Sequence, residues 1–359
     1  MKNSGLATVA QLRDFDEIVD VRTPSEFAED HIPGAINCPV LSDEERARVG
    51  TLYKQQSPFE AKKVGAALVA RNIARHIEAK WLDKPKSWHP LIYCWRGGQR
   101  SGAMTHILRQ IGFAAEKLEG GYKSYRHHVL QQLQALPPQF SFRVICGLTG
   151  SGKSHLLAAL QQAGAQVLDL EGIARHRGSV LGEMPDTAQP TQKSFDSMVL
   201  EQLESFDSGL PVYVESESKK IGLLRVPDEL IARMWESPCL LLETPLKLRV
   251  ELLREDYAHF LHDPELLHQQ LERLKNMYSG ELLNHWQSLC KDEAWDTFIA
   301  ELLERHYDPA YSKSISNHYQ HYGEACLLTL NSLNRKDFQA LADKALALSG
   351  KIINNGDIE

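Results

Sequence analysis

A glycine-rich loop near the middle of the chain constrains its fold most strongly. Residues 147 to 154 read Gly-Leu-Thr-Gly-Ser-Gly-Lys-Ser, which is the spacing of a phosphate-binding P-loop. The apolar run 142–146 precedes the loop, and residues 153–163 show helical spacing that Gly164 closes. A strand, a glycine loop and a helix in this order predict a parallel α/β sheet whose loop backbone surrounds a phosphate group.

Composition limits the class of protein. The chain has 359 residues, 43% of them hydrophobic and 24% charged, which is enough for two or three domains. Its net charge of −7 argues against a protein that coats nucleic acid non-specifically, because such binding neutralises phosphates with Lys and Arg. A local basic groove is compatible with that charge.

Cysteine spacing and hydropathy bear on metals and location. The six cysteines include no CxxC pair, so the sequence predicts neither a disulfide framework nor a zinc site, and no metal-ligand set is assigned. The first twenty residues lack the apolar core of a secretory leader, and no stretch approaches the roughly 20 apolar residues that span a bilayer. We therefore expect a cytoplasmic protein that does not contact a membrane.

Patterning along the chain predicts an α/β protein with two sheets. Apolar strands alternate with helical segments before residue 130, and the pair Pro137-Pro138 then interrupts the helical pattern. Further strands are expected at 166–170, 211–215 and 239–242, and mostly helix at 246–307. We expect a first α/β domain at 1–130, a linker at 131–140, a P-loop domain at 141–260, and a mostly helical C-terminal extension packed on it at 261–359.

A second loop carries the best candidate nucleophile. Cys94 ends an apolar strand, and Trp-Arg-Gly-Gly-Gln-Arg follows before a helix expected near Ser101. Backbone N–H groups, a helix N-terminus and the guanidinium groups of Arg96 and Arg100 would all lower the pKa of a thiol. Five residues separate Cys94 from Arg100, and this loop alone does not choose between sulfur or selenium transfer and attack on a phosphate ester.

The P-loop needs a cation and an acidic partner if it holds a nucleotide. Lys153 supplies charge to the terminal phosphates, and the Ser154 hydroxyl can reach Mg²⁺. Glu215, at the end of an expected strand, is the best acidic candidate, with Asp169 and Glu171 as others. No Asp occupies the usual metal position, so the loop can equally hold a diphosphate that is not a nucleotide. The predicted phosphate-binding residues are Gly147, Thr149, Gly150, Ser151, Gly152, Lys153, Ser154 and Glu215.

Two basic clusters are candidate contacts for RNA or phosphate, although short charged runs are usually solvated surface. The first, which directly follows the acidic segment at 169–171, is Arg175, His176 and Arg177. The second lies near the domain junction and combines charge with aromatic rings: Lys117, Lys123, Tyr125, Arg126, His127 and His128.

The two loops and their flanking segments resemble known families. Residues 20–27 (Asp-Val-Arg-Thr-Pro-Ser-Glu-Phe), residues 31–37 (His-Ile-Pro-Gly-Ala-Ile-Asn) and Cys94 resemble the rhodanese family over roughly residues 10–130. A rhodanese-like α/β domain followed by a P-loop NTPase-like α/β domain, with residues 215–222 (Glu-Ser-Glu-Ser-Lys-Lys-Ile-Gly), resembles the bacterial tRNA 2-selenouridine synthases over nearly the whole chain.

That resemblance implies a transferase acting on tRNA that carries 2-thiouridine at the wobble position. It implies replacement of the sulfur by selenium from selenophosphate, through an S-geranyl intermediate made from geranyl diphosphate. The P-loop would grip the prenyl diphosphate, Cys94 would serve the selenium step, and Arg96 and Arg100 would orient selenophosphate. The substrates would be geranyl diphosphate and selenophosphate, with no tightly bound cofactor, and a selenophosphate-producing enzyme is a candidate partner.

Two alternatives from other classes stay open at the level of sequence. One is an ATP-dependent phosphotransferase with a rhodanese-like regulatory module, which would hydrolyse ATP through Lys153 and be indifferent to loss of the Cys94 thiol. The other is a non-catalytic tRNA-binding scaffold whose Cys94 senses oxidants.

Overall fold

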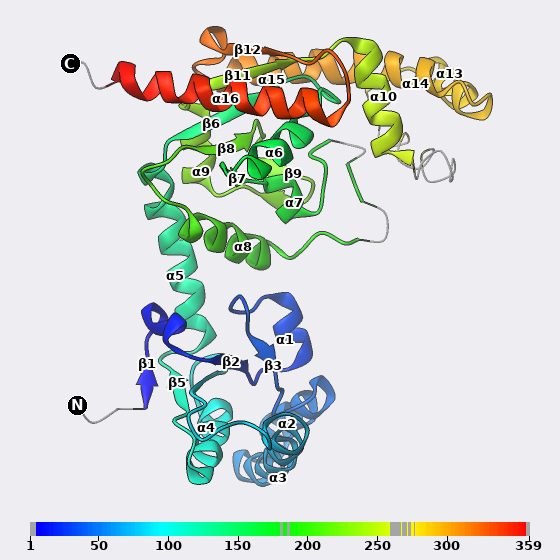
Figure 1. The fold of residues 1–359 in the computed structure, drawn as a ribbon. Helices are drawn as coiled ribbons and strands as arrows, with labels where there is room; N and C mark the ends of the chain where they lie inside the picture. The colour runs from blue at the N-terminus through cyan, green and yellow to red at the C-terminus, as the bar shows by residue number, and fades with distance from the viewer. Residues whose placement is uncertain are drawn as a thin grey trace. The chain divides into compact units, whose positions relative to one another are not determined.

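The computed structural model describes residues 5–179, 182–184, 187–258, 267, 271, 274–275 and 277–356. The chain divides into two compact units (Figure 1). The first comprises residues 1–132 and 190–201, and the second comprises 133–189 and 202–359. Helices α5 (Tyr122–Ala135) and α8 (Gln192–Ser205) each contribute residues to both units.

The first unit is built on a five-stranded parallel sheet in the order β1-β5-β4-β2-β3. Strand β4 lies at its centre and is buried along its whole length. The strands are β1 (Leu6–Ala7), β2 (Glu17–Asp20), β3 (Ile36–Asn37), β4 (Pro90–Tyr93) and β5 (Glu116–Leu118). The helices are η1 (Val9–Asp14), α1 (Pro24–Glu29), α2 (Asp43–Gln55), α3 (Pro58–His76), η2 (Ile77–Trp81) and α4 (Gln99–Ile111), together with most of α5.

Local sequence explains where several of these helices begin. Thr23 and Ser42 cap α1 and α2 with capping boxes, in which the cap side chain accepts from the N3 backbone and the N3 glutamate accepts from the cap backbone. Gly112 adopts a left-handed conformation (φ +112°) and ends α4. The core between sheet and helices includes Trp81, Trp88 and Ile92, and the buried Cys94 belongs to the same cluster.

The second unit has its own five-stranded parallel sheet in the order β12-β11-β6-β8-β7. Its strands are β6 (Phe142–Cys146), β7 (Gln166–Leu168), β8 (Val212–Glu215), β11 (Cys239–Glu243) and β12 (Cys326–Thr329), and β9 (Lys220–Ile221) pairs with β10 (Leu224–Arg225) in a separate hairpin. The helices are η3 (Pro137–Gln139), α6 (Lys153–Gln162), α7 (Leu170–Ala174), α9 (Asp228–Trp235), α10 (Leu246–Asp256), α13 (Gly280–Lys291), α14 (Trp295–Leu302), η5 (Leu303–Tyr307), α15 (Asp308–His318), η6 (Tyr322–Glu324) and α16 (Arg335–Gly356).

Two apolar clusters hold the second unit. Helices α6 and α16 pack side by side (Figure 1) and share a core with the sheet that includes Leu156, Tyr213 and Phe338. A second cluster, around Trp286 and Phe298, joins α13 and α14 to residues just after α10. Within the residues that the structure describes, no helix is long and apolar enough to cross a membrane.

The predicted fold class is confirmed, because both sheets are parallel and alternate with helices. Strand β12 was not predicted; it arises because Leu240 and Leu242 of β11 pair with residues 326 and 328, more than eighty positions later in the chain. The helical prediction for 246–307 agrees with α10, α13 and α14, and its portions at 259–266, 268–270, 272–273 and 276 lie outside the described residues. The predicted linker at 131–140 contains the end of α5 and η3.

Candidate functional site

The P-loop connects the central strand β6 to α6. Gly150 (φ +75°) and Gly152 (φ +88°) adopt left-handed conformations that side chains rarely take, and Gly152 caps the helix. Lys153 Nζ donates to the Gly147 carbonyl at 2.9 Å, so its ammonium group lies over the loop. The arrangement presents the N-terminus of α6 and the ammonium group of Lys153 to a single cavity, as an anionic phosphate requires.

Three side chains far along the sequence hold this loop in place. Thr244 Oγ1 donates to the Ser151 carbonyl at 2.7 Å, and Arg249 Nε donates to the Thr149 carbonyl at 3.0 Å. The Tyr311 hydroxyl accepts from the Gly147 N–H at 2.8 Å. Because these bonds come from the segment after β11 and from α10 and α15, the loop is fixed by tertiary contacts as well as by its glycines.

Arg249 is itself anchored. Its guanidinium donates to both carboxylate oxygens of Asp308, at 3.0 and 2.6 Å, and its side chain is only 4% exposed. A bidentate ion pair of this kind fixes the orientation of the guanidinium. The bond from Nε to Thr149 is therefore directed by α15 through Asp308.

Three carboxylates share the cavity of the P-loop. Glu171 lies in α7, Glu215 ends β8, and Glu217 follows two residues later; their carboxylate oxygens lie within 4.8 Å of one another. Burial, together with the neighbouring carboxylates, raises the pKa of Glu171 well above its usual range and that of Glu217 to about 8. Burial also raises the pKa of Glu215, against the opposing charge of Lys153.

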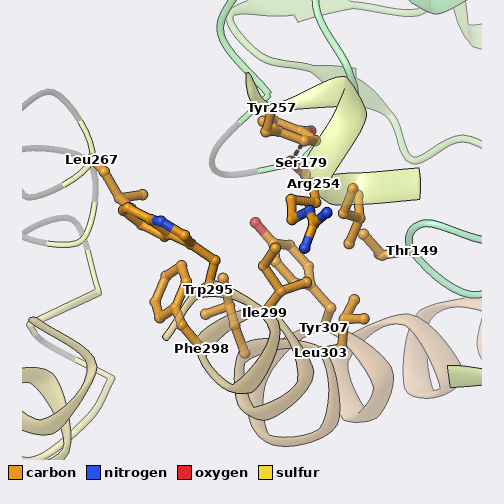
Figure 2. Close-up of a pocket in the computed structure, with 12 residues that line it drawn as sticks. Thr149, Ser179, Arg254, Tyr257, Leu267, Trp295, Phe298, Ile299, Leu303 and Tyr307 are labelled. Atoms are coloured by element: carbon orange, nitrogen blue, oxygen red, sulfur yellow. Dashed lines mark hydrogen bonds between the residues drawn. The ribbon is translucent and has the colours of Figure 1, made fainter. Parts of the chain in front are cut away.

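An apolar pocket adjoins the phosphate cavity. Thr149, Ser179, Leu253, Tyr257 and Tyr307 line both. Figure 2 shows Thr149 and Ser179 at one end of the pocket, and Leu267, Trp295 and Phe298 at the other. The cavity volume is about 60 Å³, and Leu302 and Leu303 complete the apolar lining.

Polar groups of this pocket gather near the P-loop. The hydroxyl groups of Ser179 and Tyr257 lie 3.5 Å apart. Arg254 contributes a charged edge and pairs with Asp296 at 3.1 Å, half-exposed to solvent. The pocket is therefore polar where it meets the phosphate cavity and apolar at its far end, which suits a ligand with an anionic head and a hydrocarbon tail.

The Cys94 loop lies in the first unit, between β4 and α4. The Cys94 thiol is 4% exposed, and its Sγ lies 3.2 Å from Ser101 Oγ in the first turn of α4. The Cys94 carbonyl accepts from the Tyr122 N–H at 2.9 Å, and the Trp95 ring stacks on Tyr122 with centroids 5.3 Å apart. Ser101 is thus a neighbour of the thiol that sequence reasoning treated only as a helix start.

The two predicted arginines of this loop differ in their surroundings. Arg96 is exposed, whereas Arg100 donates to both carboxylate oxygens of Glu26 at 2.6 and 3.2 Å. Burial alone would raise the pKa of Glu26, but the hydrogen bonds and charge of Arg100 outweigh it and lower that pKa below its ordinary value. Arg100 is therefore held at the N-terminal end of α4 by an acid from the rhodanese-like signature at 20–27.

Other signature residues are structural. Arg22 donates to the Asp20 carboxylate at 2.6 Å and to the Asp30 carbonyl at 2.6 Å, with both ionic side chains buried. His31 bonds the Phe27 carbonyl through Nδ1 at 2.9 Å. These contacts give Asp20, Arg22 and His31 structural roles in the first unit.

The basic clusters are partly engaged in ion pairs. Arg177 pairs with Asp256 at 3.1 Å, and Arg126 pairs with Asp196. Tyr125 is 4% exposed, so the prediction that it contacts RNA or phosphate is wrong. Lys123 and His127 are exposed.

Comparison with known proteins identifies the family. A family model described as the tRNA 2-selenouridine synthase AAA domain matches residues 140–291, and one described as a rhodanese-like domain matches residues 6–128. A tRNA 2-selenouridine synthase from Sulfurovum sp. is 34% identical over 83% of this chain and 88% of its own length. The chain belongs to the tRNA 2-selenouridine synthase family.

Further members show the same extent of similarity. Proteins of that name from Nitrosomonas europaea and Marinobacter nauticus are 35% and 33% identical, covering 80% and 83% of this chain and 80% and 88% of their own lengths. This chain is thus an enzyme of the synthase family. It carries the Cys94 loop in its first unit and the P-loop in its second.

Sequence reasoning missed several residues that the fold brings to the P-loop of this synthase-family chain. Glu217 lies in the quoted segment 215–222, so its acidity beside a strand end was a usable signal. Arg249, Asp308 and Tyr311 carry no local signal, because they reach the loop only through α10 and α15. Among the predicted phosphate-binding residues, one cavity is lined by Thr149–Ser154 and Glu215. Gly147 does not line it, but its carbonyl accepts a hydrogen bond from Lys153, which does.

Proposed function

We propose that this enzyme converts 2-thiouridine at the wobble position of tRNA to 2-selenouridine, using geranyl diphosphate and then selenophosphate. The relatives are named for synthesis of 2-selenouridine in tRNA, and the chain matches them over most of its length. The observation that carries the prenyl step is the apolar pocket that shares Thr149 with the phosphate cavity. A nucleotide has a polar base and ribose, for which a wall of Phe298, Leu302 and Leu303 offers few partners.

In the first step the thiocarbonyl sulfur attacks C1 of the geranyl group. The carbon–oxygen bond to the diphosphate breaks, and pyrophosphate leaves with the electron pair. The base gives up its N3 proton to pyrophosphate or to solvent, so a neutral S-geranyl base remains. Lys153 and the N–H groups of the P-loop would stabilise the charge that develops on the leaving pyrophosphate. The pocket would hold the hydrocarbon chain and exclude water from C1.

In the second step selenium from selenophosphate adds to C2 of the base, and geranyl thiolate leaves with the electron pair of the carbon–sulfur bond. Water then cleaves the selenium–phosphorus bond, which releases inorganic phosphate and leaves 2-selenouridine with its N3 proton restored. Alkylation makes this possible because an alkylated sulfur is a much better leaving group than a thiocarbonyl. Cys94 would act in this step, in a loop whose backbone is hydrogen-bonded to the Tyr122 N–H. Arg96 is exposed and would pair with the selenophosphate anion. Arg100 would act at the same site, with Glu26 fixing its position.

The test is mass spectrometry of nucleosides from 2-thiouridine tRNA incubated with both substrates. Wild type should yield 2-selenouridine, Lys153→Ala should leave 2-thiouridine unchanged, and Cys94→Ala should stop at the S-geranyl base. Leu223→Ala is the control, because Leu223 is 90% exposed and lies outside both cavities. No mass change with wild type, together with ATP hydrolysis that Lys153→Ala abolishes, would favour the phosphotransferase instead.

A further inference from the structure

The carboxylates of Glu171, Glu215 and Glu217 lie close together in one partly buried cavity. Three acidic groups lie within 4.8 Å of one another, with Lys153 as the cation that acts on all three. Ionised together they carry three negative charges, and Lys153 and Arg177 line the same cavity. Close like charges in a partly buried site are strongly unfavourable.

One oxygen of this cluster points to a missing partner. Glu215 is 4% exposed, and its Oε1 atom is inaccessible to solvent with no hydrogen-bond partner among the described residues. A buried carboxylate oxygen without a donor or a cation costs free energy that a native structure ordinarily avoids. Glu215 lines the cavity that Glu171 and Glu217 also line.

The donor set selects the kind of cation. All three side chains offer carboxylate oxygens, and the Ser154 hydroxyl of the P-loop lines the same cavity. Hard oxygen donors suit Mg²⁺ and Mn²⁺, whereas zinc sites usually include His nitrogen or Cys sulfur. Three carboxylates also exceed the single acid that a P-loop commonly uses beside its Ser or Thr.

We propose that Glu171, Glu215 and Glu217 form a binding site for one Mg²⁺ or Mn²⁺ ion that is filled before any diphosphate arrives. The negative charge of the three carboxylates binds the cation, so the ion stays in the site without phosphate oxygens as ligands. Its binding is independent of the substrate. Its role, which is to complement Lys153 in holding a prenyl diphosphate, rests on the proposed function.

The test is Mn²⁺ binding to the full chain, measured by electron paramagnetic resonance without RNA, nucleotide or diphosphate. Wild type should bind one Mn²⁺ per chain, and Mg²⁺ should displace it. Glu171→Gln and Glu217→Gln keep the shape of the side chain and remove one charge, so each should weaken binding at least about tenfold. Glu251→Gln, at an exposed position of α10, is the matched control and should bind as wild type does.

Thermal unfolding gives a second readout. Mn²⁺ should raise the melting temperature of wild type and of Glu251→Gln, but raise that of Glu171→Gln and Glu217→Gln little, because only bound ligand stabilises the fold. Without metal the two Gln variants should melt no lower than wild type, since each relieves repulsion between carboxylates.

Two results would overturn the site. The first is wild-type protein that binds no Mn²⁺ until pyrophosphate is added. That result would mean that the cation binds only together with the diphosphate. The second is Gln variants that bind Mn²⁺ as tightly as wild type. Neither result depends on selenouridine formation, so failure of the cation site and failure of the proposed reaction are separately visible.

Discussion

Replacement of Gly121 by alanine tests whether the Cys94 loop is held by direct backbone packing. Gly121 has φ +62°, and a Cβ atom there would lie 2.2 Å from the Cys94 carbonyl oxygen and 2.4 Å from the Gly97 nitrogen. Both are backbone atoms and cannot rotate away. To reach 3.0 Å, a contact that is still tight, the carbonyl oxygen must move by at least 3.0 − 2.2 = 0.8 Å.

The destabilisation expected for Gly121→Ala has two parts. A left-handed conformation costs a non-glycine residue about 1–2 kcal/mol, and forced overpacking adds about 1–3 kcal/mol. Gly34→Ala isolates the first part, because Gly34 has φ +74° and nothing within 4 Å of its added Cβ. We expect about 1–2 kcal/mol of destabilisation for Gly34→Ala and about 2–5 kcal/mol for Gly121→Ala.

The assay is hydrogen exchange read by mass spectrometry, with and without urea. The Tyr122 and Lys123 amides donate to the Cys94 and Trp95 carbonyls at 2.9 and 3.0 Å. Their protection should fall in Gly121→Ala and stay near the wild-type level in Gly34→Ala. Equal stability and equal protection at these two amides in both variants would refute the claim that backbone contact holds the Cys94 loop.

Three further predictions concern other contacts. Arg100 outweighs the effect of burial and lowers the pKa of Glu26 in the folded protein below 4.5. The pair therefore stabilises the first unit above about pH 4.5, and this contribution is lost as pH falls through the folded pKa. Urea titrations should show Glu26→Gln less stable than wild type at pH 7 and equal to it in acid. Phe298→Ala should destabilise the second unit by about 3–5 kcal/mol in the same titration, and calorimetry should show weaker binding of geranyl diphosphate with that of pyrophosphate unchanged. Arg249→Lys loses the fork geometry that joins Asp308 to the P-loop, so calorimetry should show pyrophosphate binding weakened about tenfold, and unchanged affinity would contradict the bracing role.

The cysteine loop shows the limit of prediction from motifs. Its position at the end of a strand and before a helix follows from residues 90–111, which carry the pattern locally. The contacts that hold the loop in place do not follow from this segment, because they come from Gly121 and Tyr122, which lie after β5. The glycine pair at 120–121 gave no sign of this contact, since a close backbone approach depends on which strands pair.

The acidic site shows the same division. Glu215 was predicted because it ends a strand beside the P-loop strand, and the register that pairs Ile145 with Glu215 places it there. Glu171 was a secondary candidate and Glu217 was not considered. Their convergence depends on how α7 and the segment after β8 turn toward the same cavity.

The sequence by itself determined the two reactive loops, the α/β class and the family, because these depend on residues within a few positions of one another and on the periodicity of apolar side chains. Only the tertiary structure decided the apolar pocket, the three-carboxylate cluster and the bracing of the P-loop by Arg249 and Tyr311. These features join residues from 147 to 311 that share no local pattern. Their proximity is set by sheet order and by helices packing on a common core, which are properties of the whole folded chain.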